Sequence, residues 1–359
     1  MKNIFIHLSA MLILLGQPTE TMAQRKQQQL GRGVVAVNSG SNVTITWRRL
    51  AQDPENAKWN VYARKSGNTE YTLLNQQPLD NTNFKTTSSI VPVGTELAVQ
   101  MIYTHGNETR EGKISDAFIV KKQNLRNIYM EIAFNGSPLK NADVSTKFVW
   151  PADLNGNGEY DYVVDRNSVN SSRHYLEAYL ADGTYLWTID MGPNEWSSTG
   201  QDDQICAYDI DCDGKSEVII QTSDGTRFWD KTKGEWGLYV NGSATGDTDN
   251  DGIIDYTNET KNNAPKYMTV VDGMTGAEKV SVEQQYDDAY NRTNKASLMG
   301  DEYNKHVGHV GIFYHDGIHP AIVMEWHTRT KEGRHMYRNS AFAYDFGADG
   351  KATNWHQLF

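Results

Sequence analysis

Residues 148–164 read FVWPADLNGNGEYDYVV, in which two apolar segments flank a loop of Asp, Asn and Gly. Residues 205–220 repeat this pattern as ICAYDIDCDGKSEVII, and residues 310–324 carry a degenerate copy, VGIFYHDGIHPAIVM. Short runs of β-branched and aromatic residues around such turns predict paired strands. Because self-similarity along a chain is typical of repeat architectures, these segments predict a repeated strand–turn–strand unit.

A second kind of segment alternates with the first and has the pattern of a hairpin around a DG or TG turn. It occurs as LEAYLADGTYLW at 176–187, MTVVDGMTGAEKVSV at 268–282 and AFAYDFGADGKATNW at 341–355. One segment of each kind supplies four strands, which is the content of one propeller blade. The predicted blades span residues 148–189, 205–282 and 310–356, with a long insertion in the second.

A propeller closes with about four to eight blades, and this sequence contains three candidates. We therefore expect residues 127–359 to form a partial β-propeller in a truncated gene product or fragment. The alternative is a complete chain that contains further blades of weaker pattern.

Residues 24–126 predict a separate small β domain, so the fold class is all-β throughout. Its strand candidates lie at residues 33–37, 42–48, 58–64, 71–74, 96–104 and 117–121. Val43-Thr-Ile-Thr-Trp47 alternates between apolar and polar residues, and Trp59 follows after a polar loop. A buried Trp on a strand is typical of sandwiches of the fibronectin type III kind. We expect a fibronectin III-like β-sandwich with a structural role.

The first 23 residues predict a signal peptide. Lys2 provides a positive start, residues 4–15 are apolar, and Thr21-Met22-Ala23 offers a small-residue cleavage site. The apolar stretch is too short to span a bilayer as a helix, so we expect a secreted or periplasmic monomer with no membrane insertion. The formal charge of −11 argues against nucleic acid as a partner. The two cysteines, Cys206 and Cys212, are expected to be unpaired thiols, with a disulfide between them as the alternative.

Three acidic loops, at residues 153–161, 209–217 and 247–255, follow one spacing rule. Oxygen-bearing side chains stand at positions 1, 3, 5 and 9, and Gly stands at position 6. The predicted side-chain ligands are Asp153, Asn155, Asn157 and Asp161, then Asp209, Asp211, Asp213 and Glu217, and finally Asp247, Asp249, Asp251 and Asp255. Position 7 offers its backbone carbonyl, from Glu159, Lys215 and Ile253.

This spacing predicts Ca²⁺ sites, because Ca²⁺ takes about six to eight oxygen ligands and a tight loop points alternate residues inward. EF-hands fit poorly, since they need a Glu at position 12 and flanking helices, whereas the first two loops run into strand patterns. Solvated acidic turns without metal are the remaining alternative. We expect structural cages rather than a catalytic metal, and we expect the third loop, which lies in the insertion, to be the one nearest to substrate.

Several longer segments resemble the rhamnogalacturonan lyases of polysaccharide lyase family eleven. They are GRGVVAV (31–37), FVWPADLNGNGEYDYVVDR (148–166), LEAYLADGTYLW (176–187), AYDIDCDGKSEVIIQTSDGT (207–226), YMTVVDGMTGAE (267–278) and the run from 290 to 326 that ends in HPAIVMEW. The resemblance implies a small N-terminal β domain followed by an eight-bladed propeller, which is incomplete here. It also implies cleavage of the rhamnogalacturonan I backbone of pectin by β-elimination, leaving an unsaturated galacturonate.

The resemblance suggests that Arg166, Asn167 and Asn170 contact this polysaccharide, although an ordinary polar loop explains them equally well. It identifies no catalytic base or acid in this chain, and it leaves endo and exo cleavage open. The main alternative is a non-catalytic, calcium-dependent carbohydrate-binding or adhesion propeller. A glycoside hydrolase with paired carboxylates is a weaker alternative, because the acidic residues are concentrated in loops with calcium spacing.

Overall fold

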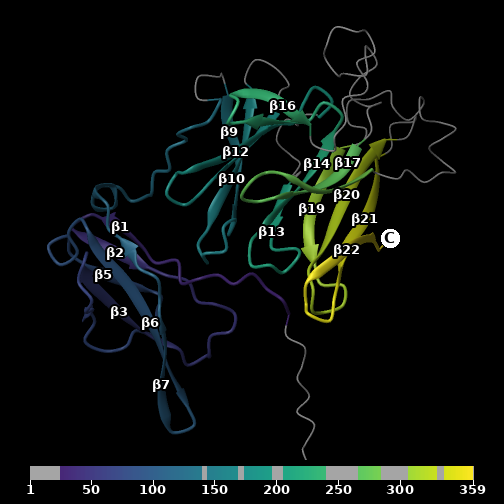
Figure 1. Cartoon of the computed structure of the whole chain (residues 1–359). Coiled ribbons are helices and arrows are strands. Elements are labelled where there is room, and N and C mark those ends of the chain that lie inside the picture. The colour runs from purple at the N-terminus through teal and green to yellow at the C-terminus, as the bar shows by residue number, and fades with distance from the viewer. Residues whose placement is uncertain are drawn as a thin grey trace, which may run out of the picture.

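The computed structural model describes residues 25–139, 144–168, 174–195, 205–239, 266–283, 306–329 and 335–358. These residues form β-strands and one short 3-10 helix, η1 (Lys122–Leu125), so the predicted all-β class is confirmed. No helix among the described residues is long and apolar enough to cross a membrane. Figure 1 shows the N-terminal strands as one body and the later strands as a succession of sheets beside it.

The N-terminal part contains two antiparallel sheets around one core. The smaller sheet has the order β1-β2-β5, formed by β1 (Val35–Ser39), β2 (Asn42–Thr46) and β5 (Asn83–Thr86). The larger has the order β4-β3-β6-β7, formed by β4 (Thr72–Leu73), β3 (Lys58–Lys65), β6 (Thr95–His105) and β7 (Glu108–Ile114), with β8 (Phe118–Ile119) also paired to β6. Trp47 and Trp59 meet edge to face in the shared core, with ring centroids 5.9 Å apart.

Each predicted repeat forms four consecutive antiparallel strands of one sheet, as the sequence predicts. The first sheet contains β9 (Val144–Ala152), β10 (Asp161–Ser168), β11 (His174–Tyr179) and β12 (Tyr185–Asp190). The second contains β13 (Ile205–Tyr208), β14 (Glu217–Ser223), β17 (Lys266–Asp272) and β18 (Glu278–Glu283). The third contains β19 (His306–Phe313), β20 (Ala321–Arg329), β21 (His335–Phe346) and β22 (Ala352–Gln357).

The insertion in the second repeat contributes two strands to the first sheet. β15 (Arg227–Asp230) pairs with β12, and β16 (Glu235–Tyr239) pairs with β15. The first sheet therefore has six strands, in the order β16-β15-β12-β11-β10-β9. The insertion thus links two successive sheets, which the sequence pattern does not predict.

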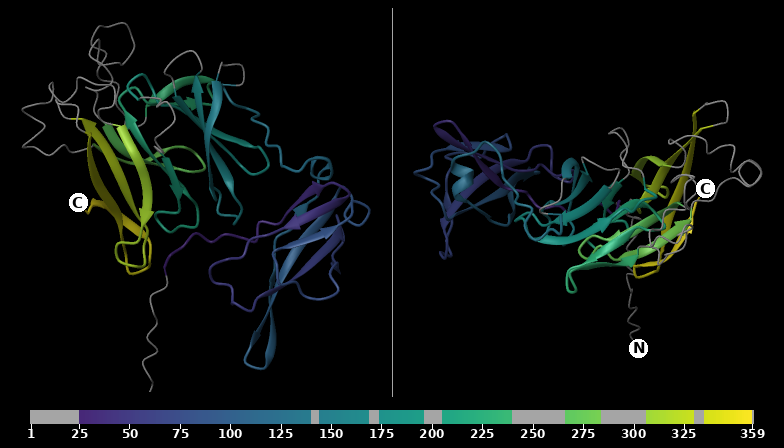
Figure 2. Two further views of the ribbon diagram at one scale, coloured as in Figure 1. Left: turned by 180° about the vertical axis from the view of Figure 1, so that it is seen from behind. Right: turned by 90° about the horizontal axis from the view of Figure 1, so that it is seen from above.

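The three sheets pack face to face, and the second is buried on both faces. Val218 and Ile220 of β14 belong to the same core as Leu176 of the first sheet. Ile219, between them, belongs to the core that contains Ile322 of the third sheet. Alternate residues of a strand point to opposite faces, so the continuous apolar run in β14 fits a strand buried on both sides. Figure 2 shows the sheets following one another in a layered series.

An extended segment at residues 25–33, here called the N-terminal strap, runs from the third sheet to the N-terminal domain (Figure 1). At one end, the backbone N–H of Lys26 donates to the carbonyl of Ile318, at 2.7 Å. At the other end, the N–H of Gly31 donates to the carbonyl of Gly158, at 2.6 Å. Between them the Gln28 side chain hydrogen-bonds Ser216. The strap therefore contacts one loop of each of the three sheets.

Candidate metal centres

The first two acidic loops occupy equivalent places in successive sheets. The first connects β9 to β10, and the second connects β13 to β14. The two loops also contact each other, since the N–H of Ser216 donates to the carbonyl of Asp153 at 2.8 Å. The prediction that both loops run into strands is confirmed. The third loop, with Asp247, Asp249, Asp251, Ile253 and Asp255, lies outside the described residues.

The first loop folds around its own carboxylates. Asp153 accepts the backbone N–H groups of Asn157 and Gly158, at 3.0 and 2.7 Å. Asp161 accepts from Leu154 at 3.1 Å and from Ala181 at 2.9 Å. Both carboxylates are buried, at 1% and 0% exposure. Asn155 and Asn157 accept further N–H groups of the loop through their side-chain oxygens, so the oxygens at positions 1, 3, 5 and 9 line one tight turn.

Two positions of each loop adopt the left-handed backbone region. Position 6 does so in Gly158 (φ 84°) and Gly214 (φ 94°), as the sequence predicts. Position 4 does so in Gly156 (φ 74°) and in Cys212 (φ 60°). Cys212 is the one non-Gly residue with positive φ in the described chain, and its Cβ makes that conformation costly.

Replacing Cys212 by Gly is therefore expected to raise the free energy of unfolding by about 0.5–1 kcal/mol, because the left-handed conformation is strained for a residue with a Cβ. The measurement is a urea titration of the variant beside the unchanged protein. Cys212→Ala is the matched control, since it removes the thiol but keeps the Cβ. An equal gain in both variants would mean that the thiol, and not the backbone, is the source.

Glu159, at position 7 of the first loop, directs its side chain away from the loop. One carboxylate oxygen accepts from Gly33 N–H at 3.1 Å, and the other accepts from the Arg48 guanidinium at 3.1 Å. Arg48 also donates to the Gly158 carbonyl and stacks on Tyr160. Only the backbone carbonyl of Glu159 thus remains for a cation, and its side chain joins the loop to the N-terminal domain.

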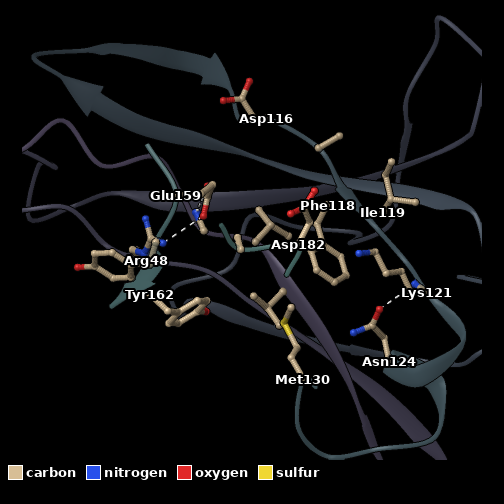
Figure 3. Close-up of a pocket in the computed structure, with 16 residues that line it drawn as sticks. Arg48, Asp116, Phe118, Ile119, Lys121, Asn124, Met130, Glu159, Tyr162 and Asp182 are labelled. Atoms are coloured by element: carbon tan, nitrogen blue, oxygen red, sulfur yellow. Dashed lines mark hydrogen bonds and ion pairs between the residues drawn. The ribbon is translucent and has the colours of Figure 1, made fainter. Parts of the chain in front are cut away.

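This junction borders a cavity of about 520 Å³ between the N-terminal domain and the first sheet. Figure 3 shows Arg48 and Glu159 at one end and Lys121 and Asn124 at the other. Phe118 and Met130 contribute to a lining that is mostly apolar. Sequence reasoning missed this contact, because Arg48 and Glu159 belong to segments that look independent along the chain.

The second loop has the same backbone pattern with more charge. Asp209 accepts from Gly214, Asp211 accepts from Asp213, and Glu217 accepts from Ile210, at 3.1, 3.2 and 3.0 Å. One ligand oxygen from each of these three acidic residues lies within 4.8 Å of the others. Asp209 Oδ1 is buried without a hydrogen-bond partner. Such an oxygen, in a set of convergent carboxylates, fits a hard cation.

The electrostatics of both loops also fit a bound cation. Desolvation raises the pKa of Asp161 and that of Asp209 to about 6, against the opposing effect of the backbone N–H donors. Burial raises the pKa of Asp153 as well. Ionised carboxylates held together away from water are unfavourable unless a positive charge is near. The second loop therefore contains a group of three acidic residues that could hold a metal ion, and the first loop holds two buried carboxylates at the equivalent positions 1 and 9.

Two of the three predicted substrate contacts are described, and they lie on β10. Arg166 donates to Glu177 at 2.9 Å, and its guanidinium also lies over the Phe134 ring. Arg166 Nε and Asn167 Oδ1 are buried without hydrogen-bond partners. Asn170 lies outside the described residues, so contact of all three with substrate stays a prediction.

Glu177 is a central buried acid that sequence reasoning missed. It is fully buried and accepts from Arg166, from the hydroxyl of Tyr179 at 3.1 Å and from that of Thr188 at 3.3 Å. Ser137 also donates to it. The sequence signal for it is a single acidic residue in the otherwise apolar segment LEAYL, at residues 176–180.

The fold and the two centres define an all-β protein of repeated four-stranded units with acidic loops suited to cations. The family model described as "Rhamnogalacturonan lyase family 11, C-terminal domain" matches residues 139–357. The model described as "Rhamnogalacturonan I lyases beta-sheet domain" matches residues 25–111. Because the first match alone covers more than half of the sequence, the chain belongs to rhamnogalacturonan lyase family 11, and the predicted resemblance is confirmed.

Two Bacillus subtilis (strain 168) proteins are similar over most of this chain. The rhamnogalacturonan endolyase YesW is 27% identical over 346 residues, which cover 92% of this chain and 49% of YesW. The rhamnogalacturonan exolyase YesX is 28% identical, over 88% of this chain and 49% of YesX. This chain therefore spans about half the length of these relatives.

Solved structures of the family have the same fold over this region. The Bacillus licheniformis rhamnogalacturonan lyase PL11 superposes with a TM-score of 0.64 at 28% identity, covering 94% of this chain and 53% of that one. The exotype rhamnogalacturonan lyase YesX also gives 0.64, at 26% identity over 94% of this chain and 51% of that one.

Proposed function

We propose that the protein is a rhamnogalacturonan lyase that cleaves the rhamnogalacturonan I backbone of pectin by β-elimination. The observation that carries this proposal is the match to the family 11 lyase model over residues 139–357. The named activities of YesW and YesX, an endolyase and an exolyase, support the same reaction class. The product expected is an oligosaccharide that ends in an unsaturated galacturonate.

The chemistry of this elimination sets three requirements. The proton at C5 of galacturonate is weakly acidic, so a positive charge or hydrogen-bond donors must neutralise the neighbouring carboxylate. A base must reach that proton, and an acid or water must protonate the departing oxygen. We propose Arg166 and Asn167, with Asn170, as substrate contacts that position the sugar. The match of residues 139–357 to the family 11 lyase model supports this role.

We also propose that the acidic loops bind Ca²⁺ and that the repeated sheets are blades of a β-propeller. The buried carboxylates at equivalent hairpins support the calcium assignment, and the four-stranded antiparallel units that pack face to face support the propeller. Bound Ca²⁺ neutralises the loop carboxylates and holds the hairpins in place. We propose that residues 24–126 form a fibronectin III-like domain and that residues 127–359 form part of the propeller. We propose residues 1–23 as a signal peptide, and we expect the protein to be a monomer that is secreted or periplasmic.

The test is incubation of the protein, purified from the cells that make it, with rhamnogalacturonan I. Ultraviolet absorbance from the new C4–C5 double bond is expected to increase with time. Polygalacturonan, which lacks rhamnose, is the control substrate and is expected to give no increase. Binding of rhamnogalacturonan I without any gain in absorbance would contradict the lyase proposal and favour the non-catalytic binding alternative.

A further inference from the structure

Three carboxylates of the second loop each accept a backbone N–H of the loop through one oxygen and have a second oxygen that accepts none. Asp209 Oδ2, Asp211 Oδ1 and Glu217 Oε2 accept backbone N–H groups of the loop. Asp209 Oδ1, Asp211 Oδ2 and Glu217 Oε1 are left for another partner. A carboxylate oxygen that accepts one N–H keeps a lone pair for a cation, but these three oxygens accept no backbone N–H and are the most accessible to one.

A lysine side chain already takes two of these three oxygens. The ammonium of Lys279, on β18, lies 2.6 Å from Asp211 Oδ2 and 2.7 Å from Glu217 Oε1. Its side chain is about three-quarters buried and comes from the strand at the edge of the same sheet. Asp209 Oδ1 is the oxygen without a partner. The lysine thus supplies positive charge at the place that the spacing of the loop assigns to a metal ion.

Among the residues that the structure describes, no lysine forms an ion pair with the carboxylates of the first loop. In the first sheet, β11 and β12 contain the same register shift as β17 and β18, and Leu186 lies at the place that Lys279 takes in the second sheet. Leu186 is buried and apolar. The oxygen of Asp161 that corresponds to Glu217 Oε1 accepts the N–H of Ala181 instead. The two sheets have the same topology, but a lysine contacts the acidic loop in the second sheet and a leucine lies at the equivalent position in the first.

The second loop, which contacts the lysine, is also the more negatively charged of the two loops. The side chains at positions 1, 3, 5 and 9 include two carboxylates in the first loop and four in the second. Two carboxylates balance one divalent ion, whereas four leave an excess of negative charge that a lysine can offset. An ammonium and a divalent ion at the same oxygens repel each other.

We propose that Lys279 is the resident cation of the second loop, so that a divalent ion binds there only by displacing the lysine. The second loop then binds Ca²⁺ weakly, because the ion must compete with Lys279. The first loop binds Ca²⁺ more tightly. This inference rests on the calcium binding proposed above for the loops. It makes Lys279 a residue that sets ion affinity and stabilises the metal-free second loop.

The test is calorimetric titration of the metal-stripped protein with Ca²⁺, in the unchanged chain and in Lys279→Met. The variant is expected to bind Ca²⁺ at one site about tenfold more tightly or better, because it loses a competing positive charge next to four carboxylates. Adding Asp211→Asn to Lys279→Met is expected to abolish that gain. Lys233→Met, which removes an exposed lysine paired with Asp230, is the matched control and is expected to leave all affinities unchanged.

Lys279→Gln provides a second variant if Lys279→Met does not fold without metal, since Gln keeps polar contact with the acids but carries no charge. It has the same expected gain in affinity. Unchanged or weaker Ca²⁺ binding in these variants, while Asp153→Asn still removes a tight site, would overturn the role proposed for Lys279. The calcium proposal for the first loop would stand. Absence of Ca²⁺ binding in every protein would overturn the calcium proposal and this inference together.

Discussion

Replacement of Glu177 by Ala is expected to lower the free energy of unfolding by about 3–5 kcal/mol, because it leaves a buried cation without its acid. Glu177 is fully buried, and its partner Arg166 is 12% exposed. The Ser137, Tyr179 and Thr188 hydroxyls would also lose their shared acceptor. Unsatisfied buried donors add to the cost of the lost ion pair.

The measurement is the denaturant midpoint of the variant and of the unchanged protein by circular dichroism. Glu235→Ala is the matched control, because Glu235 lies on β16 of the same sheet with an exposed side chain. That control is expected to change stability by less than about 0.5 kcal/mol. A midpoint for Glu177→Ala as high as that of the control would mean that Arg166 finds another partner or reaches water.

Removal of Ca²⁺ with EDTA is expected to lower the melting temperature, because an ion bound only by the folded protein stabilises it by mass action. With free Ca²⁺ at 100 times the dissociation constant, one site contributes about 2.7 kcal/mol. Asp161→Asn is expected to reduce the effect of EDTA, since it removes one buried charge of the first loop. EDTA already saturated with Ca²⁺ is the control reagent. Equal melting curves with and without chelator would contradict the calcium assignment.

The same experiment has a predicted pH dependence. Burial raises the pKa of Asp161 to about 6 in the folded, metal-free protein, above its ordinary value of about 3.9 in an unfolded chain. A raised pKa means that the protonated acid favours the folded state at low pH and that this contribution is lost as the pH rises through about 6. The destabilisation by EDTA should therefore grow between about pH 4 and pH 7. A difference that shrinks over this range would contradict a cation at these carboxylates.

Local pattern was sufficient to predict most of the strands and both described acidic loops. The loops are predictable because their spacing is a property of nine consecutive residues. The strands β10 and β14 are predictable because each contains a short apolar run, Tyr162-Val-Val164 and Val218-Ile-Ile220. β7 was missed because its sequence, ETREGKI, is polar on both faces. β5 was missed because four residues, NFKT, are too few for an alternating pattern to stand out.

The rest depends on contacts between distant segments, which a single sequence does not specify. The pairing of β15 with β12 places an insertion of the second repeat on the first sheet. The sequence alone does not distinguish Lys279 from any other lysine in a hairpin. The strand register places its ammonium beside Asp211 and Glu217. The Arg48–Glu159 ion pair likewise joins residues of different domains.

The N-terminal strap can be attached in full only after all three sheets have formed. Lys26 leaves the ribosome early, yet it pairs with Ile318 and with the hydroxyl of Tyr314, which are made almost 300 residues later. The partners of Gln28 and Gly31 are Ser216 and Gly158, which are made sooner after the strap than Ile318 is. Contacts of such long sequence separation form slowly and late. The strap therefore closes contacts of increasing sequence separation from Gly31 to Lys26, and its last contact depends on the third sheet.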